Sequence, residues 1–548
     1  MSSSALRSRD QARRLAPWLF VLAYLALVVA WVGANPPGAA PDEPAHYVKA
    51  LGAGAGQLAG RPLPDRSEEG LTSLTPRQTA WQLRTSRLVA VPPALAAPPW
   101  LSCNAHLTEV SSACREPGEP APDRDVQPTY VGTYQPFLYV VPGWVARLAG
   151  DVSNAILLAR GAGVIVALAL VALAVLTLWD PEVGAASLVG LLLALTPMVV
   201  FLASAVSASG AEVAAGLCYL AAVLRLCRRR APSTLAWVAL ALGGSVLSSS
   251  RSLGPVWVVL GAAVLPAVVG VRASVAVVRD GGRRALAAAG AVAVAMGASL
   301  AWELTRQAHP DTGGGVILGG VVPALQELSE VYRQHVGVFG WLDTRLPLEG
   351  YLLWTLGLAA LVVSALVLGT TRQRVVLAVL TSVSVAVSVV VSAALIRPTG
   401  FGMQARYVMP LTVVVPLFAG EVVRSQWTRV RSSPATAFLG LAVVAVAAVQ
   451  FLGWYTNARR HAVGTAGPKL FLGLAEWQPP LGWLPWMVLA LVGSGLLVLA
   501  VGLAGNRSVG PQPSRASPSQ RPPSETTPWR SKGVPGTTSK RKARWRTS

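Results

Sequence analysis

Two carboxylates and an imidazole stand close together in the segment Pro41-Asp-Glu-Pro-Ala-His46, just after the first long apolar run of the chain. Prolines suit the first turn of a helix, so the segment predicts a helix that begins at its first proline. Such a helix places Asp42 and His46 on one face, with Lys49 one turn further along. This group could move a proton or, with Glu43, hold a divalent cation. The simpler interpretation is an acidic helix cap, because carboxylates stabilise that end of a helix.

Arginines form a second group of polar residues, far from the first in the sequence. Arg397, Gln404, Arg406 and Tyr407 belong to one glycine-containing segment, and Arg251 stands among serines. The topology derived below puts these arginines on the outer side of a membrane, against the tendency of basic residues to stay inside. A phosphate or diphosphate head group explains them through forked, charge-assisted hydrogen bonds. The alternative is that each side chain reaches toward the phosphates of ordinary lipids.

The segment Phe339-Gly-Trp-Leu-Asp-Thr-Arg-Leu-Pro347 sets the ring of Trp341 beside Asp343 and Arg345. Aromatic rings flanked by hydrogen-bonding groups suit a sugar, whose apolar face stacks while its hydroxyls bind polar groups. These three residues are therefore candidate binding residues. A tryptophan at a membrane interface is also an ordinary anchor, and that interpretation stays open.

The four cysteines divide into two pairs. Cys103 and Cys114 lie in the first long polar segment, where an oxidising compartment would permit a disulfide. Cys218 and Cys227 lie in or near an apolar run and are expected to stay reduced. A metal site that combines the first pair with His106 is the alternative, but no fourth ligand follows at a spacing typical of zinc. We favour the disulfide.

Membrane-spanning helices must position all these groups. The chain has 548 residues, of which 53% are hydrophobic and only 13% charged. Apolar runs near the roughly 20 residues that cross a bilayer recur along the sequence. They predict an all-α polytopic membrane protein with about twelve spans, near residues 18–34, 154–179, 184–205, 210–226, 234–247, 253–271, 285–305, 351–369, 375–396, 407–423, 437–455 and 484–504.

Basic residues orient these spans. Arginine clusters recur near residues 225–230, 279–284, 372–374 and 424–431. With twelve spans they all face one side, which the positive-inside tendency makes cytoplasmic. Arginines precede the first span and no cleavage site follows it, so we expect a retained anchor with a cytoplasmic N-terminus. All five histidines fall on the outer side, together with two large loops, residues 35–153 and 306–349.

The chain divides into a cytoplasmic N-terminus over residues 1–15, a multi-span domain over residues 16–505 and a tail over residues 506–548. The tail is rich in Pro, Ser, Thr, Lys and Arg and has almost no large aliphatic side chains, so we expect a disordered basic cytoplasmic tail. The net charge of +21 does not indicate nucleic-acid binding. The basic residues lie at loop ends and termini, where membrane lipids are the expected partner.

The polar chemistry lies mainly outside the spans. Glu212, near the start of the fourth span, and Glu421, near the end of the tenth, are among the few buried charges. A coupled transporter would keep ionisable groups near the membrane midplane. No phosphate-binding loop, dinucleotide fingerprint or nucleophile elbow appears in a suitable context. This distribution favours an enzyme that works at the outer surface of the membrane.

Four segments carry a family resemblance: Pro41 to His46, Tyr134-Gln-Pro-Phe-Leu-Tyr139, Phe339 to Thr344, and Gln404-Ala-Arg-Tyr-Val-Met-Pro410. Over about residues 15–505, the chain resembles the bacterial membrane proteins of domain-of-unknown-function family 2142 (DUF2142). That family in turn resembles the C-type fold (GT-C) glycosyltransferases, multi-span enzymes that use polyprenyl-phosphate sugars outside the cytoplasmic membrane. One departure is Ala405, where the family more often has glycine before the arginine.

The resemblance implies that a sugar passes from a polyprenyl-phosphate donor to a glycan or lipid acceptor of the cell envelope. It points to Asp42 as the general base, with Glu43 beside it and His46 orienting it. Stabilisation of the leaving phosphate falls to Arg251, Arg397 and Arg406.

No cofactor is assigned, and a divalent cation on Asp42, Glu43 and His46 stays open. Two alternatives to sugar transfer also stay open. One is a lipid-linked glycan transporter or flippase, in which the arginines bind a lipid phosphate without chemistry. The other is a cell-wall glycan polymerase or ligase.

Overall fold

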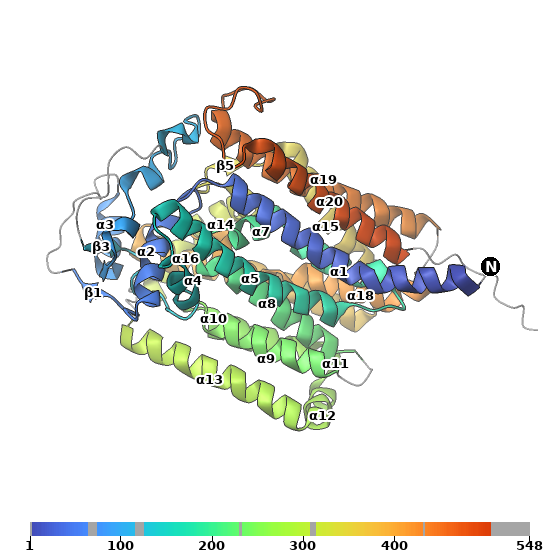
Figure 1. Cartoon of the computed structure of the whole chain (residues 1–548). Coiled ribbons are helices and arrows are strands. Elements are labelled where there is room, and N and C mark those ends of the chain that lie inside the picture. Colours follow the sequence, from blue (N-terminus) through green and yellow to red (C-terminus); the bar gives the residue numbers. More distant parts are fainter. Residues whose placement is uncertain are drawn as a thin grey trace, which may run out of the picture. The chain divides into compact units, whose positions relative to one another are not determined.

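A computed structural model of the chain describes residues 3–63, 74–115, 125–228, 233–306, 314–430 and 433–505. Helices dominate these residues, and their strands form two small antiparallel sheets (Figure 1). Eight of the described helices are long and apolar enough to cross a membrane: α1 (Ser3–Ala34), α5 (Val152–Leu178), α8 (Ala208–Leu226), α13 (Arg283–Arg306), α15 (Leu348–Leu368), α16 (Thr371–Thr399), α19 (Ser433–Val463) and α20 (Trp483–Gly505). The fold is that of an all-α polytopic membrane protein.

The other four predicted spans are broken or short. Residues 184–205 divide where Thr196 precedes Pro197, because the residue before a proline avoids the helical conformation. The apolar run from Gly254 bends by 111° at Gly270, whose φ of 91° suits only glycine. The elements in these regions are η4 (Gly184–Ser187), α6 (Val189–Ala194), α7 (Pro197–Ala203), α9 (Thr234–Ser248), α10 (Gly254–Ala262), α11 (Val264–Val269), α12 (Val271–Gly281), η5 (Ala405–Tyr407), α17 (Met409–Thr412) and α18 (Val414–Val430). The described chain thus offers eight spans, or nine if the bent pair counts as one, where the sequence predicts about twelve.

A long helix lies where the sequence analysis expects only a loop. Residues 306–349 contain α14 (Gly314–Val336), followed by the hairpin of β4 (Val338–Phe339) and β5 (Thr344–Arg345). α14 contains charged residues such as Glu327 and Glu330, so its sequence does not form the apolar run that predicts a membrane span. The helix packs against α16 at Gly320, where a Cβ atom would lie 2.4 Å from a backbone oxygen of that helix.

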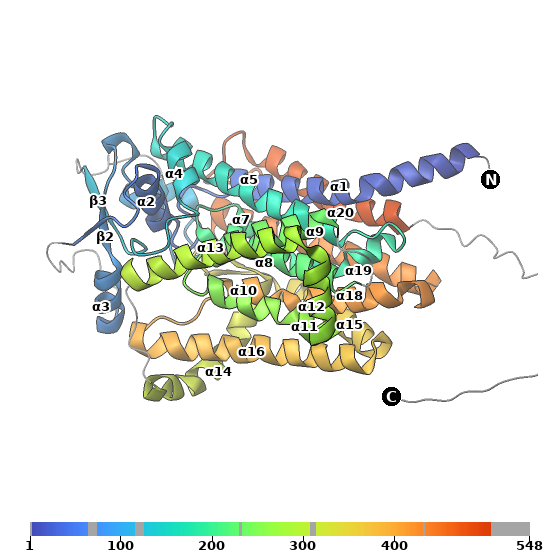
Figure 2. The same ribbon diagram turned by 90° about the horizontal axis from the view of Figure 1, so that it is seen from below.

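The described residues of 35–153 form a folded layer at one end of the helices, on the left in Figures 1 and 2. Its antiparallel sheet has the order β1-β2-β3. The layer contains α2 (Glu43–Gly54), β1 (Arg61–Pro62), α3 (Pro76–Thr85), β2 (Arg87–Ala90), η1 (Pro93–Leu95), η2 (Pro99–Ser102), η3 (Ser112–Arg115), β3 (Val126–Thr129) and α4 (Val140–Ala146). Lys49 crosses its interior, where Nζ donates 2.6 Å hydrogen bonds to the carbonyls of Leu58 and Gly132. Lys49 is therefore a buried strut, although the sequence analysis places it on an exposed polar face.

Packing around α1 fixes the segment that follows it. The ring of Trp31 lies 5.3 Å from that of Phe201 and 4.9 Å from that of Phe339. Trp454 on α19 donates a 3.1 Å hydrogen bond to the carbonyl of Ala30. These aromatic contacts hold the C-terminal end of α1 rigidly, so the acidic segment emerges at a defined place.

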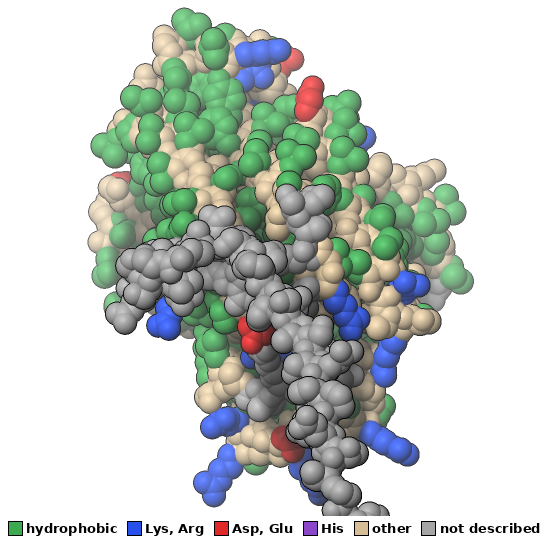
Figure 3. Space-filling view, turned by 90° about the vertical axis from the view of Figure 1, so that its right-hand side faces the viewer, with side chains coloured by type: hydrophobic (Ala, Val, Ile, Leu, Met, Phe, Trp, Pro, Cys, Tyr) green, Lys and Arg blue, Asp and Glu red, His purple; other side chains and the backbone are tan. Residues whose placement is uncertain are grey.

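Basic side chains gather at the end opposite to this layer. The α15–α16 connection, α12 and the C-terminal part of α18 all lie on the right in Figure 2. Figure 3 views this end and shows Lys and Arg side chains around its margin. Exposed arginines of these elements are Arg272, Arg279, Arg283, Arg284, Arg372, Arg374 and Arg429. This distribution places the basic clusters at one end, and the predicted basic tail lies outside the described residues.

Cys103 and Cys114 are joined in a disulfide, which is the pairing favoured from the sequence. Next to it, Arg115 donates to the carbonyls of Pro37 and Leu101. The disulfide-bonded loop is therefore connected to the backbone just before the acidic segment. Cys218 is a free, buried thiol, as expected.

Removing this disulfide should lower stability. The bond closes a loop with a sequence separation of 11, for which loss of loop-closure entropy predicts a cost near 3 kcal/mol. We expect the double variant Cys103→Ser/Cys114→Ser to unfold at a lower temperature in detergent, as followed by tryptophan fluorescence. The variant Cys227→Ser, which removes a free thiol and no disulfide, is the control. An unchanged midpoint for the first variant would contradict the prediction.

Candidate active site

Asp42 stands at the N-cap of α2, in a backbone conformation that is rare for residues other than glycine. The helix begins at Glu43 and not at Pro41, and Asp42 has a φ of 60° and a ψ of 10°. Aspartate tolerates this left-handed conformation better than most residues, yet it still costs energy. The acidic segment is therefore more than a capping turn, because no side-chain cap bond forms at Asp42.

Two residues from distant parts of the chain bind the Asp42 carboxylate. Tyr130 donates a 2.8 Å hydrogen bond to Oδ1, and Arg406 forms an ion pair with Oδ2. Burial raises the pKa of Asp42, but the charge of Arg406 and the hydrogen bonds from Tyr130 and Arg406 outweigh burial and lower the pKa. About a quarter of the Asp42 side chain is exposed, whereas only 2% of Arg406 is. The result is an ionised carboxylate that a ligand can reach.

Glu43, the neighbour of Asp42, is fully buried elsewhere. Its carboxylate accepts hydrogen bonds of 2.6 and 2.8 Å from the guanidinium of Arg160 on α5. The backbone amides of Gly38 and Val206 donate to it at 3.0 and 2.9 Å. Arg160 also binds three carbonyls at the end of α1. Glu43 therefore ties the acidic segment to the spans, and the geometry gives no support to a catalytic role beside Asp42.

His46 lies behind Asp42 and is almost completely buried. Its Nδ1 shares a 2.8 Å hydrogen bond with the hydroxyl of Tyr139, whose ring it stacks on. Burial, with the charges of Arg251 and Arg406, lowers the pKa of His46 to about 3, although Asp42 opposes the shift. The imidazole is therefore neutral at ordinary pH. Among the described hydrogen bonds, Tyr130 and Arg406 orient the Asp42 carboxylate, and the His46 ring does not.

Asp42 opens into a cavity of about 390 Å³, a size typical of small-ligand sites. Arg251 lies in its wall, where Nη2 donates a 2.8 Å hydrogen bond to Ser209 and Nε lies 3.3 Å from the carboxylate of Glu212. The lining residues are Asp42, Trp81, Gln82, Thr85, Tyr130, Tyr134, Gln135, Glu212, Arg251, Ser252, Leu253, Glu303, Val391, Ala394, Leu395, Thr399, Phe401, Gly402, Gln404 and Tyr407. The cavity thus joins the folded layer to α8, α10, α13 and α16.

Tyr407 connects the two cationic groups of the site. Its ring lies 5.3 Å from the guanidinium of Arg251 and 5.7 Å from that of Arg406. The ring of Tyr134 also packs against Arg251, and its centre lies 5.6 Å from the guanidinium. Such contacts fix the planes of the two guanidinium groups beside Asp42 and Glu212, with which they pair.

Comparison with known proteins places the chain in a family. Residues 25–415 match the family described as "Predicted membrane protein (DUF2142)". The chain belongs to the DUF2142 family. No curated protein matches it in sequence. Among solved structures, ArnT from Cupriavidus metallidurans in the apo state is similar with 15% identity and a TM-score of 0.40, covering 89% of this chain and 76% of that one. A likeness of that size is too weak to support an inference about activity.

The DUF2142 protein brings together only some of the residues singled out from its sequence. Those that line the cavity or contact a lining residue are Asp42, His46, Arg251, Gln404, Arg406 and Tyr407. Gln404 contributes a buried Oε1 atom with no hydrogen-bond partner in the described chain. The segment around Arg406 therefore reaches the acidic segment across the fold.

Four predicted binding residues of the DUF2142 protein lie outside the cavity. Asp343 pairs with Arg460 at 3.4 Å and accepts a bond from the backbone of His106. Arg345 is exposed and pairs with Glu330 at 2.9 Å. The remaining two bind backbone carbonyls: Trp341 donates to Gly38 at 3.1 Å, and Arg397 donates to Gly319 at 2.9 Å. These side chains hold loops in place, which explains their polarity without a ligand.

The same geometry bears on metal binding. Within the described part of the DUF2142 protein, no three His, Cys, Asp or Glu side chains lie close enough together to hold a metal ion. Both carboxylate oxygens of Glu43 bind Arg160 and backbone amides, so Glu43 does not join Asp42 as a ligand. The donor set proposed from sequence does not fit a cation, and we derive no step through one.

Several lining residues were missed by the sequence analysis. Tyr130 and Gln135 belong to the aromatic segment that ends the first long loop, and Glu212 was noted only as a buried charge. Trp81 and Gln82 lie on α3, a polar helix that begins with a capping box formed by Thr75 and Gln78. This local signal predicts the start of a helix but not its place at the cavity.

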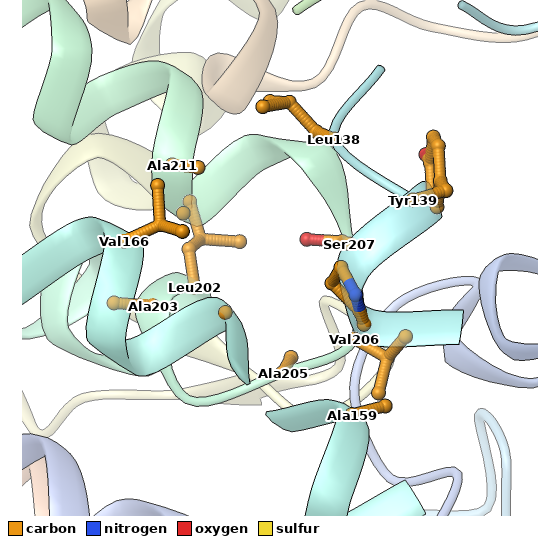
Figure 4. Close-up of a pocket in the computed structure, with 13 residues that line it drawn as sticks. Leu138, Tyr139, Ala159, Val166, Leu202, Ala203, Ala205, Val206, Ser207 and Ala211 are labelled. Atoms are coloured by element: carbon orange, nitrogen blue, oxygen red, sulfur yellow. The ribbon is translucent and has the colours of Figure 1, made fainter. Parts of the chain in front are cut away.

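A second cavity lies between α4, α5, α7 and α8 and measures only about 30 Å³ (Figure 4). Its lining is mostly apolar, with Val166, Leu202 and Ala211 among the labelled side chains. The hydroxyl of Ser207 points into it and has no hydrogen-bond partner in the described chain. The volume suits about one water molecule and not a substrate.

Proposed function

We propose that this DUF2142 protein is a glycosyltransferase that moves a sugar from a polyprenyl-phosphate donor to a cell-envelope acceptor. The observation that carries the proposal is the single cavity in which the carboxylate of Asp42, the guanidinium of Arg251 and the ring of Tyr407 meet. A base, a cation for a phosphate and aromatic surface are what this reaction requires. The basic clusters at the opposite end support an extracytoplasmic site in the cytoplasmic membrane.

The two walls of the cavity support a lipid-linked donor. One wall is apolar and comes from α16 and the residue that precedes α10, with Val391, Leu395 and Leu253. The other is polar and aromatic and comes from the folded layer, with Trp81 and Tyr130. A ligand that fills both walls has an apolar tail joined to a polar head group. A polyprenyl-phosphate sugar has this form.

The reaction follows from the positions of the charges. An acceptor hydroxyl attacks the anomeric carbon of the donor sugar, and its proton passes to the carboxylate of Asp42. The bond from that carbon to the phosphate oxygen breaks, and the oxygen leaves with the bonding electrons as polyprenyl phosphate. Arg251 and Arg406, held by the Tyr407 ring, stabilise the charge on this leaving group. Arg406 also keeps Asp42 ionised until the proton arrives.

A transfer assay tests the function. Purified protein in nanodiscs is incubated with radiolabelled polyprenyl-phosphate sugars and a crude cell-envelope acceptor fraction. Transfer of label by the wild type, with release of polyprenyl phosphate, is the expected result. Binding of the donor without any transfer would instead favour a lipid-linked glycan transporter, and growth of long chains from preformed glycans would favour a polymerase or ligase.

The dependence of transfer on pH tests the coupling of Arg406 to Asp42. A base must be ionised to act, and the pKa of Asp42 is lowered from its usual 3.8, so transfer should not fall with acid until below that value. In Arg406→Gln, burial is no longer opposed by the ion pair, and the pKa should rise. We expect the acid limb of kcat/KM to move to higher pH, measured between pH 4 and 8. Arg345→Gln, outside the cavity, should leave the limb in place; an unmoved limb in Arg406→Gln would contradict the coupling.

A further inference from the structure

We infer that the polar wall of the cavity contains a subsite that recognises the sugar through its hydroxyl groups, with Gln135 as the fixed acceptor. This inference rests on the proposed function and extends it, because it assigns the part of the donor that each wall binds. The residues involved come from the folded layer, from α13 and from the segment just before η5. None of them is among the residues that the sequence analysis proposed for binding, apart from Gln404.

Gln135 is buried, with 1% of its surface exposed, and lines the cavity. Its amide nitrogen donates a 2.8 Å hydrogen bond to the hydroxyl of Ser299 on α13. Its Oε1 atom is buried and has no hydrogen-bond partner within the described residues. A buried acceptor left unpaired is costly, so a partner is expected in the ligand-bound state. With the amide nitrogen bound to Ser299, Oε1 is the atom that Gln135 offers to a ligand.

The chemistry of the free atom selects the ligand group. A carbonyl oxygen needs a hydrogen donor, and an ionised phosphate has none to give. Gln404, on the facing segment, offers a second buried and unpaired Oε1 atom to the same cavity. Two acceptors on facing segments of one cavity suit a ligand with several hydroxyls. Trp81, in the polar wall, provides a ring on which the apolar face of a sugar can stack.

The position of this subsite fits the cationic site beside it. Tyr134, the residue before Gln135, packs against the guanidinium of Arg251. The phosphate-binding group and the hydroxyl-binding group are therefore adjacent in the cavity wall. A sugar attached directly to a phosphate places its hydroxyls and its phosphate at this kind of spacing. The donor would thus lie with its phosphate at Arg251 and its sugar against Gln135.

A binding comparison tests the subsite without requiring turnover. Bare polyprenyl monophosphate and a panel of polyprenyl-phosphate hexoses and pentoses compete with a fluorescent polyprenyl phosphate for the full-length protein in nanodiscs. In the wild type, at least one sugar-bearing lipid should bind roughly tenfold more tightly than the bare lipid. Gln135→Leu should bring this ratio close to one and leave the affinity for the bare lipid unchanged. Gln135→Glu, which keeps an acceptor oxygen, should retain most of the ratio.

Ser299→Ala is the second variant, because it releases the amide without touching the cavity lining. It should lower the ratio by part of the Gln135→Leu effect, and it decides the case if Gln135→Leu fails to fold. The inference is overturned if no sugar-bearing lipid exceeds the bare lipid in the wild type, or if both variants keep the full ratio. If the wild type shows the ratio but transfers no sugar, the proposed transferase activity is wrong and the proposed subsite stands. If the protein transfers sugar but Gln135→Leu keeps the full ratio, the transferase activity stands and only the proposed subsite is wrong.

Discussion

Asp42→Asn should lower the rate of sugar transfer by about 10²- to 10⁴-fold, the usual contribution of a positioned general base. Asparagine has no basic oxygen, so the acceptor hydroxyl can no longer pass its proton to this position. It keeps the size of aspartate and tolerates the left-handed backbone at φ 60°. The initial rate of label transfer in nanodiscs is the measurement, at donor concentrations both below and above saturation.

The substitution also leaves the buried Arg406 without its counter-charge, which could weaken folding. Asp42→Glu separates the two effects, because it keeps the charge but moves the carboxylate by one methylene. It should retain stability and still lose most of the rate. Asp125→Asn, an exposed carboxylate of the same folded layer, is the matched control and should transfer normally.

Unchanged transfer by Asp42→Asn would show that Asp42 is not the base. If the wild type and the variant both bind the lipid-linked sugar and neither transfers it, the transporter becomes the better account of the cavity. In that case Arg406→Gln should still weaken binding of the lipid, because its charge would serve the phosphate alone.

Glu43→Gln should destabilise the fold by roughly 3–5 kcal/mol, the cost of leaving a buried charge without its partner. Glu43 and Arg160 are both completely buried, and each of the two carboxylate oxygens of Glu43 accepts a bond from the guanidinium and another from a backbone amide. Neutralising the Glu43 carboxylate leaves the Arg160 guanidinium without a counter-charge, among the carbonyls at the end of α1. The midpoint of thermal unfolding in detergent, followed by tryptophan fluorescence, should fall well below that of the wild type.

An exposed ion pair is the control for this prediction. Arg345→Gln removes the pair with Glu330, in which the arginine side chain is 60% exposed. Such pairs contribute about 1 kcal/mol or less, so the unfolding midpoint should barely move. A Glu43→Gln protein as stable as the wild type would contradict the structural role of this carboxylate. Substitutions at the two neighbouring acids are thus expected to have opposite effects. Asp42→Glu lowers the transfer rate and keeps the stability of the fold, whereas Glu43→Gln lowers that stability.

Much of the membrane architecture is readable from local sequence. An apolar run long enough to cross a bilayer must form a helix there, because its backbone groups can be satisfied only internally. Eight of the predicted runs are long helices in the structure. The pairing of Cys103 with Cys114 is also local, since the two lie in one short loop. By contrast, the charged residues of α14 prevent its prediction from hydropathy. A proline or glycine breaks other apolar runs into short helices, as Pro197 does.

Only part of the candidate site could be predicted from the sequence. The sequence by itself determined that acids, arginines and aromatic residues gather outside the spans, because membrane insertion sorts residues by polarity. Tertiary structure alone decided which of them meet. Asp42 and Glu43 are adjacent, yet the left-handed turn at Asp42 sends one carboxylate to Arg406 in the cavity and the other to Arg160 in the core. Ion pairs between residues hundreds of positions apart depend on helix packing, which no local pattern specifies.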